Sequence, residues 1–354
     1  MQPSFHPYTW TLWLVAGMSM VLLTRNPLYL LILLVAAGLL YAVLLQEAAQ
    51  HGNSAASQQP LAWRVIVRLA LFLWGFTILF NALTVHVGPH ILFTLPRWPV
   101  IGGPITLEAL VYGFVTGLNF VSLILLFAIY NSVLGPHDIL RMIPGFAYQT
   151  GVAISIAISF VPQTVVAWSE IREAQRLRGH RVKGWRDTLP LFISLLSHGL
   201  DRAIQLAESM DARGFGGRIL PANPRQMWLV RSSALLGLLL MLAGLISKSW
   251  HTAVPWLGLS LMAAGATLML LSLWQGGARV QRSRYRRWLW RPQDWALLLS
   301  SGLMLLTTTI IHWRWPHWLY YYPYPPHNLI PDFNALLGLL FILPLMPALL
   351  RKGS

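Results

Sequence analysis

Long apolar runs with few or no charged residues recur along most of the 354-residue chain and constrain its fold more than any other feature. A helix needs about 20 apolar residues to cross the hydrocarbon core of a bilayer. Runs near this length occupy residues 9–24, 28–45, 65–87, 105–130, 232–246, 254–273, 295–311 and 334–350. The pattern predicts an all-α polytopic membrane protein with about eight transmembrane helices and additional cytoplasmic helices.

The composition supports a membrane protein and limits its partners. Only 10% of the residues are charged, whereas about a quarter are charged in soluble domains. The net charge of +15 is that of many nucleic-acid-binding proteins, but the basic residues lie between the apolar runs. That distribution is typical of cytoplasmic loops under the positive-inside rule, so we expect the lipid bilayer as neighbour and no nucleic acid. The chain has no cysteine, which excludes disulfides and thiolate metal sites.

Two segments do not fit the simple pattern of spans. Residues 88–104 are rich in glycine and proline, and we expect them to re-enter the membrane or to lie at its surface. Residues 145–160 form a short apolar run bounded by Pro144 and Pro162. A run of this length is marginal for crossing, so a span and an interfacial helix remain alternatives, and the orientation of the N-terminus remains open with them.

A region of soluble character separates the two sets of spans. Residues 165–225 hold ten of the 26 lysines and arginines and six of the 11 acidic residues, which places the region in the cytoplasm. Its first predicted helix, 163–179, has apolar residues at mostly threefold spacing and ends in Arg178-Gly179. Glycine accepts the left-handed conformation that ends many helices, and a cation is favourable at a helix C-terminus.

The second predicted helix of this region, 191–213, is also amphipathic. It follows Pro190 and ends in Ala212-Arg213-Gly214. Its apolar face includes Phe192, Leu196, Leu200 and Met210. Two helices therefore end in Arg-Gly 35 residues apart. The repetition suits two exposed arginine tips, although helix capping alone, or two helices lying on the membrane surface, would leave the same pattern.

A longer string of residues makes a resemblance specific. Residues 202–215, which end in Ala212-Arg213-Gly214-Phe215, resemble the second Ala-Arg-Gly motif of the T component of energy-coupling-factor (ECF) transporters, the CbiQ-type family. Residues 160–162 and 174–179 resemble its first motif. The likeness covers residues 8–250, with two departures. Leu177 stands where the family has alanine, and three further apolar segments follow within residues 254–350.

The resemblance implies a non-catalytic coupling subunit of an ATP-driven importer in the cell membrane of a prokaryote. Two ABC-type ATPase subunits would contact Arg178, Gly179, Ala212, Arg213 and Gly214. The apolar face of the second helix would contact the transmembrane helices, and a separate substrate-binding S component would carry a vitamin or a transition-metal ion such as cobalt or nickel. ATP and Mg²⁺ would bind the partner ATPases, and this chain would bind no cofactor. Consistently, it contains no Gly-Lys-Ser or Gly-Lys-Thr of a Walker A loop.

The predicted organisation has four parts. Residues 1–131 would hold four transmembrane helices, residues 132–226 the coupling domain, and residues 227–250 one further span. Residues 251–354 would hold additional spans, whose role we leave unassigned.

The remaining candidate sites are four histidines and Glu108. His86 and His90 are four apart, and His312 and His317 flank an aromatic loop, but neither pair has a His-Glu-x-x-His pattern or a carboxylate cluster. We therefore predict no metal site. Glu108, near the start of a span, is either functional or an interfacial acid in contact with water.

The alternative to a coupling subunit is a self-contained secondary transporter or another polytopic membrane protein, such as a membrane enzyme. A transporter of that kind would need polar groups that converge near the membrane midplane. The spans offer few of them, mainly Glu108 and Asn119. We expect Asn119 to bond to a neighbouring helix.

Overall fold

The computed structural model describes residues 5–50, 59–94, 103–144, 147–179, 184–215, 224–249, 255–277, 290–325 and 330–351. The chain divides into two compact units. Unit 1 combines Met1–Gly135 with Arg287–Ser354, and unit 2 is Pro136–Arg286. The two ends of the chain therefore build one unit, although about 150 residues separate them in the sequence.

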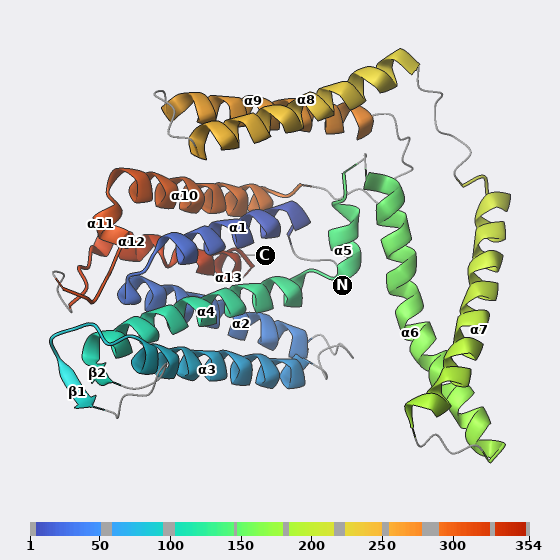
Figure 1. Ribbon diagram of the computed structural model, residues 1–354, viewed down its shortest axis with the longest axis horizontal. Helices are drawn as coiled ribbons and strands as arrows, with labels where there is room; N and C mark the ends of the chain where they lie inside the picture. The colour runs from blue at the N-terminus through green and yellow to red at the C-terminus, as the bar shows by residue number, and fades with distance from the viewer. Residues whose placement is uncertain are drawn as a thin grey trace. The chain divides into compact units, whose positions relative to one another are not determined.

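Unit 1 is a helical bundle with a small β-ribbon at one end (Figure 1). Its long helices are α1 (Pro7–Leu23), α2 (Pro27–Gln50), α3 (Gln59–Thr84), α4 (Leu107–Val133) and α10 (Pro292–Arg314). Helix α1 lies beside both α4 and α10, while α4 also contacts α2 and α3. The close approach of α3 to α4 depends on small residues, because Gly117 faces the Trp74 ring and Gly113 faces the backbone of Ile78.

Capping side chains set several helix starts in unit 1. Thr106 Oγ1 accepts from the Ala109 N–H at 3.4 Å and begins α4. Asn26 Oδ1 accepts from the Leu28 N–H at 3.0 Å at the tight link between α1 and α2. These short polar side chains satisfy amides that have no partner within the helix. The Asn26-Pro27 pair thereby turns the chain between two apolar helices in very few residues.

The core of unit 1 is aromatic and joins the two ends of the chain. Trp10 and Trp13 on α1 and Tyr29 on α2 are at most 1% exposed. Tyr29 stacks on Phe341, which is also fully buried, with 5.1 Å between the ring centroids. The C-terminal segment therefore completes the packing of the first two helices.

The last predicted span is not a continuous helix. Residues 334–350 form α12 (Ala335–Leu340), a 3₁₀ turn η3 (Leu343–Leu345) and α13 (Met346–Arg351). Pro344, which lies in the turn, lacks the N–H that would continue the α-helical ladder. The Pro344 carbonyl instead accepts a hydrogen bond from Trp13 Nε1 at 3.1 Å.

The loop predicted to re-enter the membrane is partly a ribbon. Strands β1 (Ile91–Thr94) and β2 (Pro104–Thr106) pair antiparallel, with Ile91 opposite Thr106 and a register shift between Ile91 and Phe93. Residues 95–102 lie outside the described part of the chain. Pairing satisfies backbone groups that an irregular loop would leave open beside an apolar phase.

Unit 2 contains five helices in the described residues. They are α5 (Pro136–Arg141), α6 (Tyr148–Leu177), α7 (Trp185–Ala212), α8 (Pro224–Ser249) and α9 (Pro255–Gly277). Helices α8 and α9 pack with their backbones in near contact. A Cβ added to Gly265 would lie 2.6 Å from the Gly237 carbonyl, and one added to Gly244 would lie 2.7 Å from the Gly258 carbonyl. Such glycine contacts are typical of helix pairs in membranes.

Seven described helices are long and apolar enough to cross a bilayer, and two shorter apolar segments, Pro7–Leu23 and Ala335–Leu350, accompany them. The prediction of an all-α polytopic membrane protein is confirmed, with one short ribbon added. Helix α6 is among the seven by length and composition. The sequence suggested a short apolar run and a separate amphipathic helix in this region. The structure joins them into one helix, α6, which is long enough to count as a candidate span.

Candidate functional site

The candidate site lies on α6 and α7, whose C-terminal ends carry the two Arg-Gly pairs. Helix α6 runs without a break from Tyr148 to Leu177 and includes Pro162. The predicted boundary at Pro162 is therefore wrong. Proline removes one backbone hydrogen bond and bends a helix, but here the helix continues on both sides of it.

Helix α7 begins earlier than predicted. It starts at Trp185 rather than Leu191, so Pro190 is its sixth residue instead of its first. The side chain of Asp187 supports this start, since its Oδ2 accepts from the Gly184 N–H at 3.3 Å. A carboxylate in the first turn of a helix is also favoured by the helix dipole.

Both helices end as their sequences predict. Gly179 and Gly214 have φ of +80° and +70°, in the left-handed region. After α7 the Gly214 N–H bonds to the Asp211 carbonyl at 2.8 Å and the Phe215 N–H bonds to the Met210 carbonyl at 2.9 Å. These two bonds make up a Schellman motif. After α6 the Gly179 N–H bonds in the same way to the Arg176 carbonyl at 3.0 Å.

The residues around both tips are open to the outside of the chain. Arg178, Gly179, Ala212, Arg213 and Gly214 are all exposed. Leu177, which replaces the expected alanine, is 85% exposed. Within the described residues, neither Arg178 nor Arg213 forms an ion pair. An uncompensated guanidinium at a helix end is free to fork onto a carboxylate of another molecule.

The two tips lie at opposite ends of the α6–α7 pair. The helices are antiparallel, because the Phe215 ring, just past the end of α7, contacts the Tyr148 ring at the start of α6 with 6.5 Å between centroids. Midway along, the Arg202 guanidinium lies over the Phe160 ring at 5.5 Å. Figure 1 shows the two helices crossing, with the end of α6 far from the end of α7. A helix of 30 residues is about 45 Å long.

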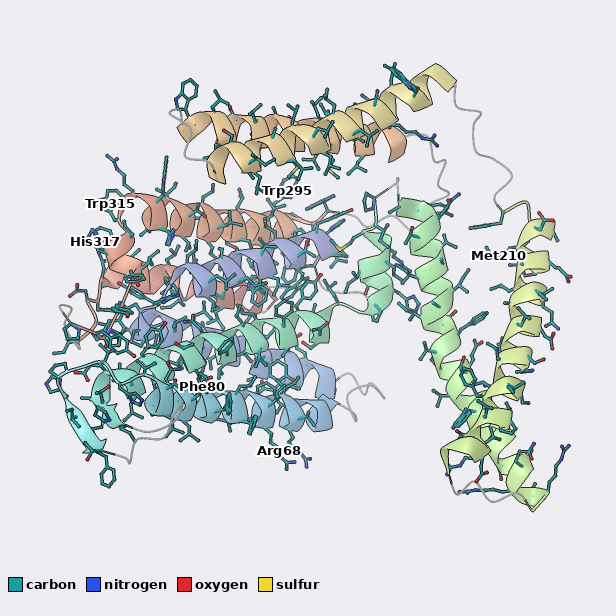
Figure 2. The ribbon with its side chains drawn as sticks, viewed as in Figure 1. Arg68, Phe80, Met210, Trp295, Trp315 and His317 are labelled. Atoms are coloured by element: carbon teal, nitrogen blue, oxygen red, sulfur yellow. The ribbon has the colours of Figure 1, made fainter. Side chains whose placement is uncertain are left out.

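The apolar face predicted on α7 is uncovered by the described chain over most of its length. Phe192, Leu196 and Leu200 are 56–62% exposed, while Met210 is half-buried. The neighbouring Leu191 is buried at 2% exposure. The side chains of α7 project outward along the helix, with Met210 near its C-terminal end (Figure 2). The predicted contact of this face with transmembrane helices stays a prediction.

Glu108 is neither solvated at an interface nor isolated. It is 1% exposed, and its Oε1 lies 2.6 Å from His90 Nδ1 and accepts from the His90 N–H at 3.3 Å. This pair fastens the ribbon to the first turn of α4. The sequence gives no direct signal for it, since the two residues are 18 apart and meet only through the ribbon.

The other polar candidates have local partners. His86 Nδ1 lies 3.3 Å from the Pro104 carbonyl, and the His317 ring packs edge-on against Trp318 at 5.8 Å. Figure 2 places His317 beside Trp315 at the end of α10 opposite Trp295. The prediction for Asn119 is wrong, because its Nδ2 donates to the Val115 carbonyl of its own helix at 3.4 Å. Among the described residues no three His, Asp or Glu side chains gather as a metal site would need.

Comparison with known families decides the class of the protein. A family model described as cobalt transport protein, CbiQ, matches residues 4–222, which include both Arg-Gly tips. The chain belongs to the CbiQ family. It is a multi-pass membrane protein of the prokaryotic cell membrane. Helices α8 to α13 follow the matched residues.

Relatives of known name support this membership. The energy-coupling factor transporter transmembrane protein EcfT of Bacillus subtilis is 27% identical over 208 residues, which are 53% of this chain and 72% of the relative. The protein of the same name from Staphylococcus aureus is 24% identical over 203 residues, covering 50% of this chain and 76% of the relative. The CbiQ-family chain described here thus covers about three quarters of the length of these relatives.

Proposed function

We propose that this chain is the transmembrane coupling subunit of an ECF-type importer and transmits the motion of two ABC-type ATPases to a substrate-binding S component. The observation that carries the proposal is the α6–α7 pair, which holds one exposed arginine at each of its two opposite ends. Two separate tips suit two ATPase subunits, each of which would receive one tip.

The antiparallel arrangement also constrains how the pair lies at the membrane. Helix α7 carries charged residues through its length and cannot cross a bilayer without burying them. They include Asp187, Asp201, Arg202, Glu208 and Asp211. Because α6 pairs with α7 in reverse direction, a crossing α6 would put Arg178 and Arg213 on opposite sides of the membrane. Both tips reach cytoplasmic ATPases if the pair lies along the membrane surface, with Phe192, Leu196 and Leu200 toward the apolar phase or a partner.

Coupling through such a pair needs no chemistry on this chain. ATP-driven closure of the ATPases would displace the two tips relative to each other, and rigid helices would carry the displacement to the membrane part. We expect ATP and Mg²⁺ on the ATPases and the cargo on the S component. A transition-metal ion is a cargo consistent with the description of the family, and a vitamin is the alternative.

A first experiment tests the tips by co-purification. The tagged chain is expressed with its two ATPase subunits, and the amount of ATPase retained is measured for Arg178→Ala, Arg213→Ala and the double variant. Removing one partner of a desolvated charge pair weakens binding by roughly 30-fold or more, so we expect partial loss in each single variant and nearly complete loss in the double variant. Arg172→Ala removes an exposed charge from α6 and is the matched control. Full retention by the double variant would contradict the proposal.

A second experiment tests the orientation of the pair. The chain has no cysteine, so a single cysteine placed at Arg178 or Arg213 can be labelled without background. A membrane-impermeant maleimide should label both positions only when the cytoplasmic face is accessible. Labelling of the two positions from opposite faces would show that α6 crosses the membrane and would refute the surface arrangement.

Uptake by the purified chain without ATPases would instead favour a self-contained transporter.

A further inference from the structure

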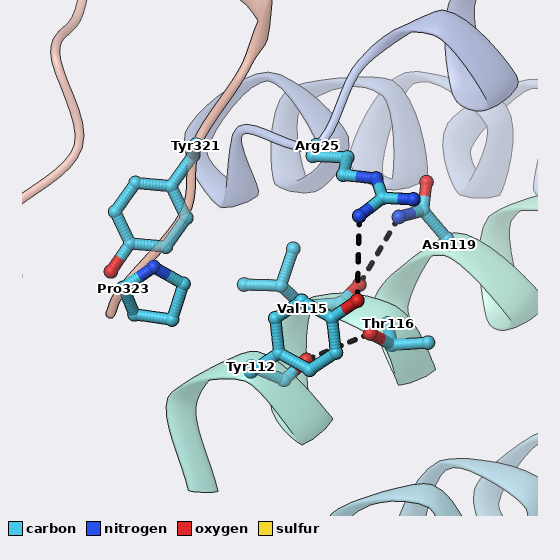
Figure 3. Close-up of a pocket in the computed structure, with 7 residues that line it drawn as sticks. All are labelled: Arg25, Tyr112, Val115, Thr116, Asn119, Tyr321 and Pro323. Atoms are coloured by element: carbon cyan, nitrogen blue, oxygen red, sulfur yellow. Dashed lines mark hydrogen bonds between the residues drawn. The ribbon is translucent and has the colours of Figure 1, made fainter. Parts of the chain in front are cut away.

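A small cavity with a mixed polar and apolar lining opens in unit 1 at the end of the bundle where α1 turns into α2. Its volume is about 90 Å³. It is lined by Arg25, Tyr112, Val115, Thr116, Asn119, Tyr321 and Pro323. The lining thus comes from the α1–α2 link, from α4 and from the tyrosine-rich segment after α11 (Pro316–Leu319). Figure 3 shows the Arg25 guanidinium and the Asn119 amide converging above the Tyr112 ring, with Tyr321 and Pro323 across the cavity.

Arg25 brings a cation to this cavity without a carboxylate to balance it. Its Nη1 donates to the Tyr112 hydroxyl at 3.3 Å, and its guanidinium lies over the Tyr320 ring at 5.9 Å. No acidic side chain of the described residues forms an ion pair with it. Most of the five N–H groups of the guanidinium therefore remain available for an anion. Arg25 is exposed, so an anion from outside the chain can reach these N–H groups and accept charge-assisted hydrogen bonds from them.

The hydroxyl and amide groups beside Arg25 add further requirements for a ligand. The Tyr112 oxygen accepts from Arg25, which leaves its own proton free to donate. Thr116 cannot donate, because its hydroxyl already donates to the Tyr112 carbonyl at 2.9 Å. Asn119 is the informative residue. Its Nδ2 bonds to Val115, but its Oδ1 is buried and has no hydrogen-bond partner.

A buried acceptor without a donor calls for an explanation. A bare anion has no proton to donate, so it would leave Asn119 Oδ1 without a partner. We propose that this cavity binds a phosphate ester whose alcohol part carries a hydroxyl or ammonium group. The phosphate would lie beside the hydrogen-bonded Arg25 and Tyr112 and accept from the free N–H groups of Arg25 and from the Tyr112 O–H, since a guanidinium fork matches phosphate oxygens. The hydroxyl or ammonium would donate to Asn119 Oδ1. Val115 and Pro323 provide an apolar wall for the carbon atoms of the ligand.

This chemistry has two sources, a phospholipid headgroup and a free phosphate ester. Tyrosines around the cavity suit the headgroup level of a membrane, where aromatic residues with a polar tip are enriched. Tyr112 packs against Tyr322 and Tyr324 with centroids 6.0 and 5.6 Å apart. The site is independent of the proposed coupling role, because it lies in unit 1 and shares no residue with α6 or α7.

The experiment measures the thermal midpoint of the full chain in detergent while one of three probes is titrated. The probes are dioleoylphosphatidylglycerol, dioleoylphosphatidylcholine and sn-glycerol 3-phosphate. A ligand that binds only the folded state raises the midpoint. We expect phosphatidylglycerol to raise it at lower concentration than phosphatidylcholine, whose headgroup has no hydrogen-bond donor. Arg25→Gln should weaken the phosphatidylglycerol response about tenfold or more, as loss of a charged hydrogen bond does.

Two further variants keep the test decisive. Arg314→Gln removes an exposed cation from the end of α10 in the same unit and should leave the response unchanged. Asn119→Ala should abolish the preference for phosphatidylglycerol over phosphatidylcholine while the Arg25 contact remains. If glycerol 3-phosphate gives the Arg25-dependent response and the lipid does not, the ligand is the soluble ester. An equal response to both lipids, an equal loss in Arg314→Gln, or no response to any probe would overturn the proposal.

Discussion

At the scale of single residues, the ends of α6 and α7 show why arginine followed by glycine suits an exposed tip. The glycine takes a positive φ and lets the chain leave the helix at once. The last carbonyls of the helix are satisfied by the amides that follow, as in the bonds to Asp211 and Met210. The arginine side chain is therefore not needed for capping. The arginine side chain stays available for an external partner. If the Arg-Gly pairs served capping alone, no arginine would be needed at these positions.

The conformation of Gly214 leads to a prediction about the α7 tip. Gly214→Ala should destabilise the end of α7 by about 1 kcal/mol, since a Cβ is unfavourable in the left-handed conformation. The cost comes from the backbone alone, because a Cβ would meet nothing within 4 Å. Hydrogen exchange of the amides of Gly214 and Phe215 should become faster.

The matched control for this prediction lies in the same helix. Gly199 also has open space where a Cβ would lie, but it sits in the helix interior. Gly199→Ala should slow exchange, since alanine favours a helix interior over glycine by about 1 kcal/mol. Slower exchange at Gly214 and Phe215 in Gly214→Ala would be incompatible with the Schellman ending.

At the scale of elements, pairing decides what each helix of unit 2 can do. Helix α6 is apolar enough for a span, but its partner α7 is not, and the contact between Tyr148 and Phe215 sets their directions. Helices α8 and α9 differ, since both are apolar and meet through glycines. The first pair is suited to a surface and the second to the interior of a bilayer.

The glycine contact between α8 and α9 is testable by adding one carbon atom. Gly265→Ala places a Cβ about 2.6 Å from the Gly237 carbonyl, so the helices must separate. Overpacking of this kind costs roughly 1–3 kcal/mol, and the thermal midpoint of the chain in detergent should fall. Gly302→Ala in α10 meets nothing within 4 Å and should not lower it. Equal midpoints for the two variants would contradict the tight α8–α9 contact.

At the scale of the whole molecule, the two ends of the chain build one unit. The His6 N–H donates to the buried Asp294 carboxylate at 2.6 Å, and the same carboxylate accepts from the Arg291 N–H at the start of α10. Near the other end of the bundle, Asn26 Nδ2 donates to the Asp332 carbonyl at 2.7 Å. The C-terminal segment is therefore part of the fold of the first helices and no loose addition to it.

The buried Phe341 offers a measure of this dependence. Phe341→Ala should destabilise the chain by about 3 kcal/mol, the lower part of the range for large core truncations, because the ring is fully buried against Tyr29. Leu339→Ala, two residues earlier at the end of α12, removes a side chain that is 63% exposed and is the control. If both variants have the same thermal midpoint in detergent, the C-terminal segment does not contribute to the core.

The sequence by itself determined the features that depend on local chemistry. Long uncharged runs predict membrane helices, because a helix satisfies its backbone N–H and C=O groups within its own segment, as lipid requires. Glycine after Arg178 and Arg213 predicts the helix ends, because only local backbone geometry is involved. Proline was less informative about where helices end. Pro162 lies inside α6, which continues through it, whereas the residues around Pro344 form a 3₁₀ turn.

Only the tertiary structure decided which distant residues meet. The stacking of Phe341 on Tyr29, the hydrogen bond between Glu108 and His90 and the cavity beside Arg25 each combine segments whose own sequences carry no sign of the partner. The physical reason is that apolar helices present similar faces to one another. The hydrophobic pattern predicts that a helix enters the membrane. The fit of its side chains and a few buried hydrogen bonds then determine which helices it packs against.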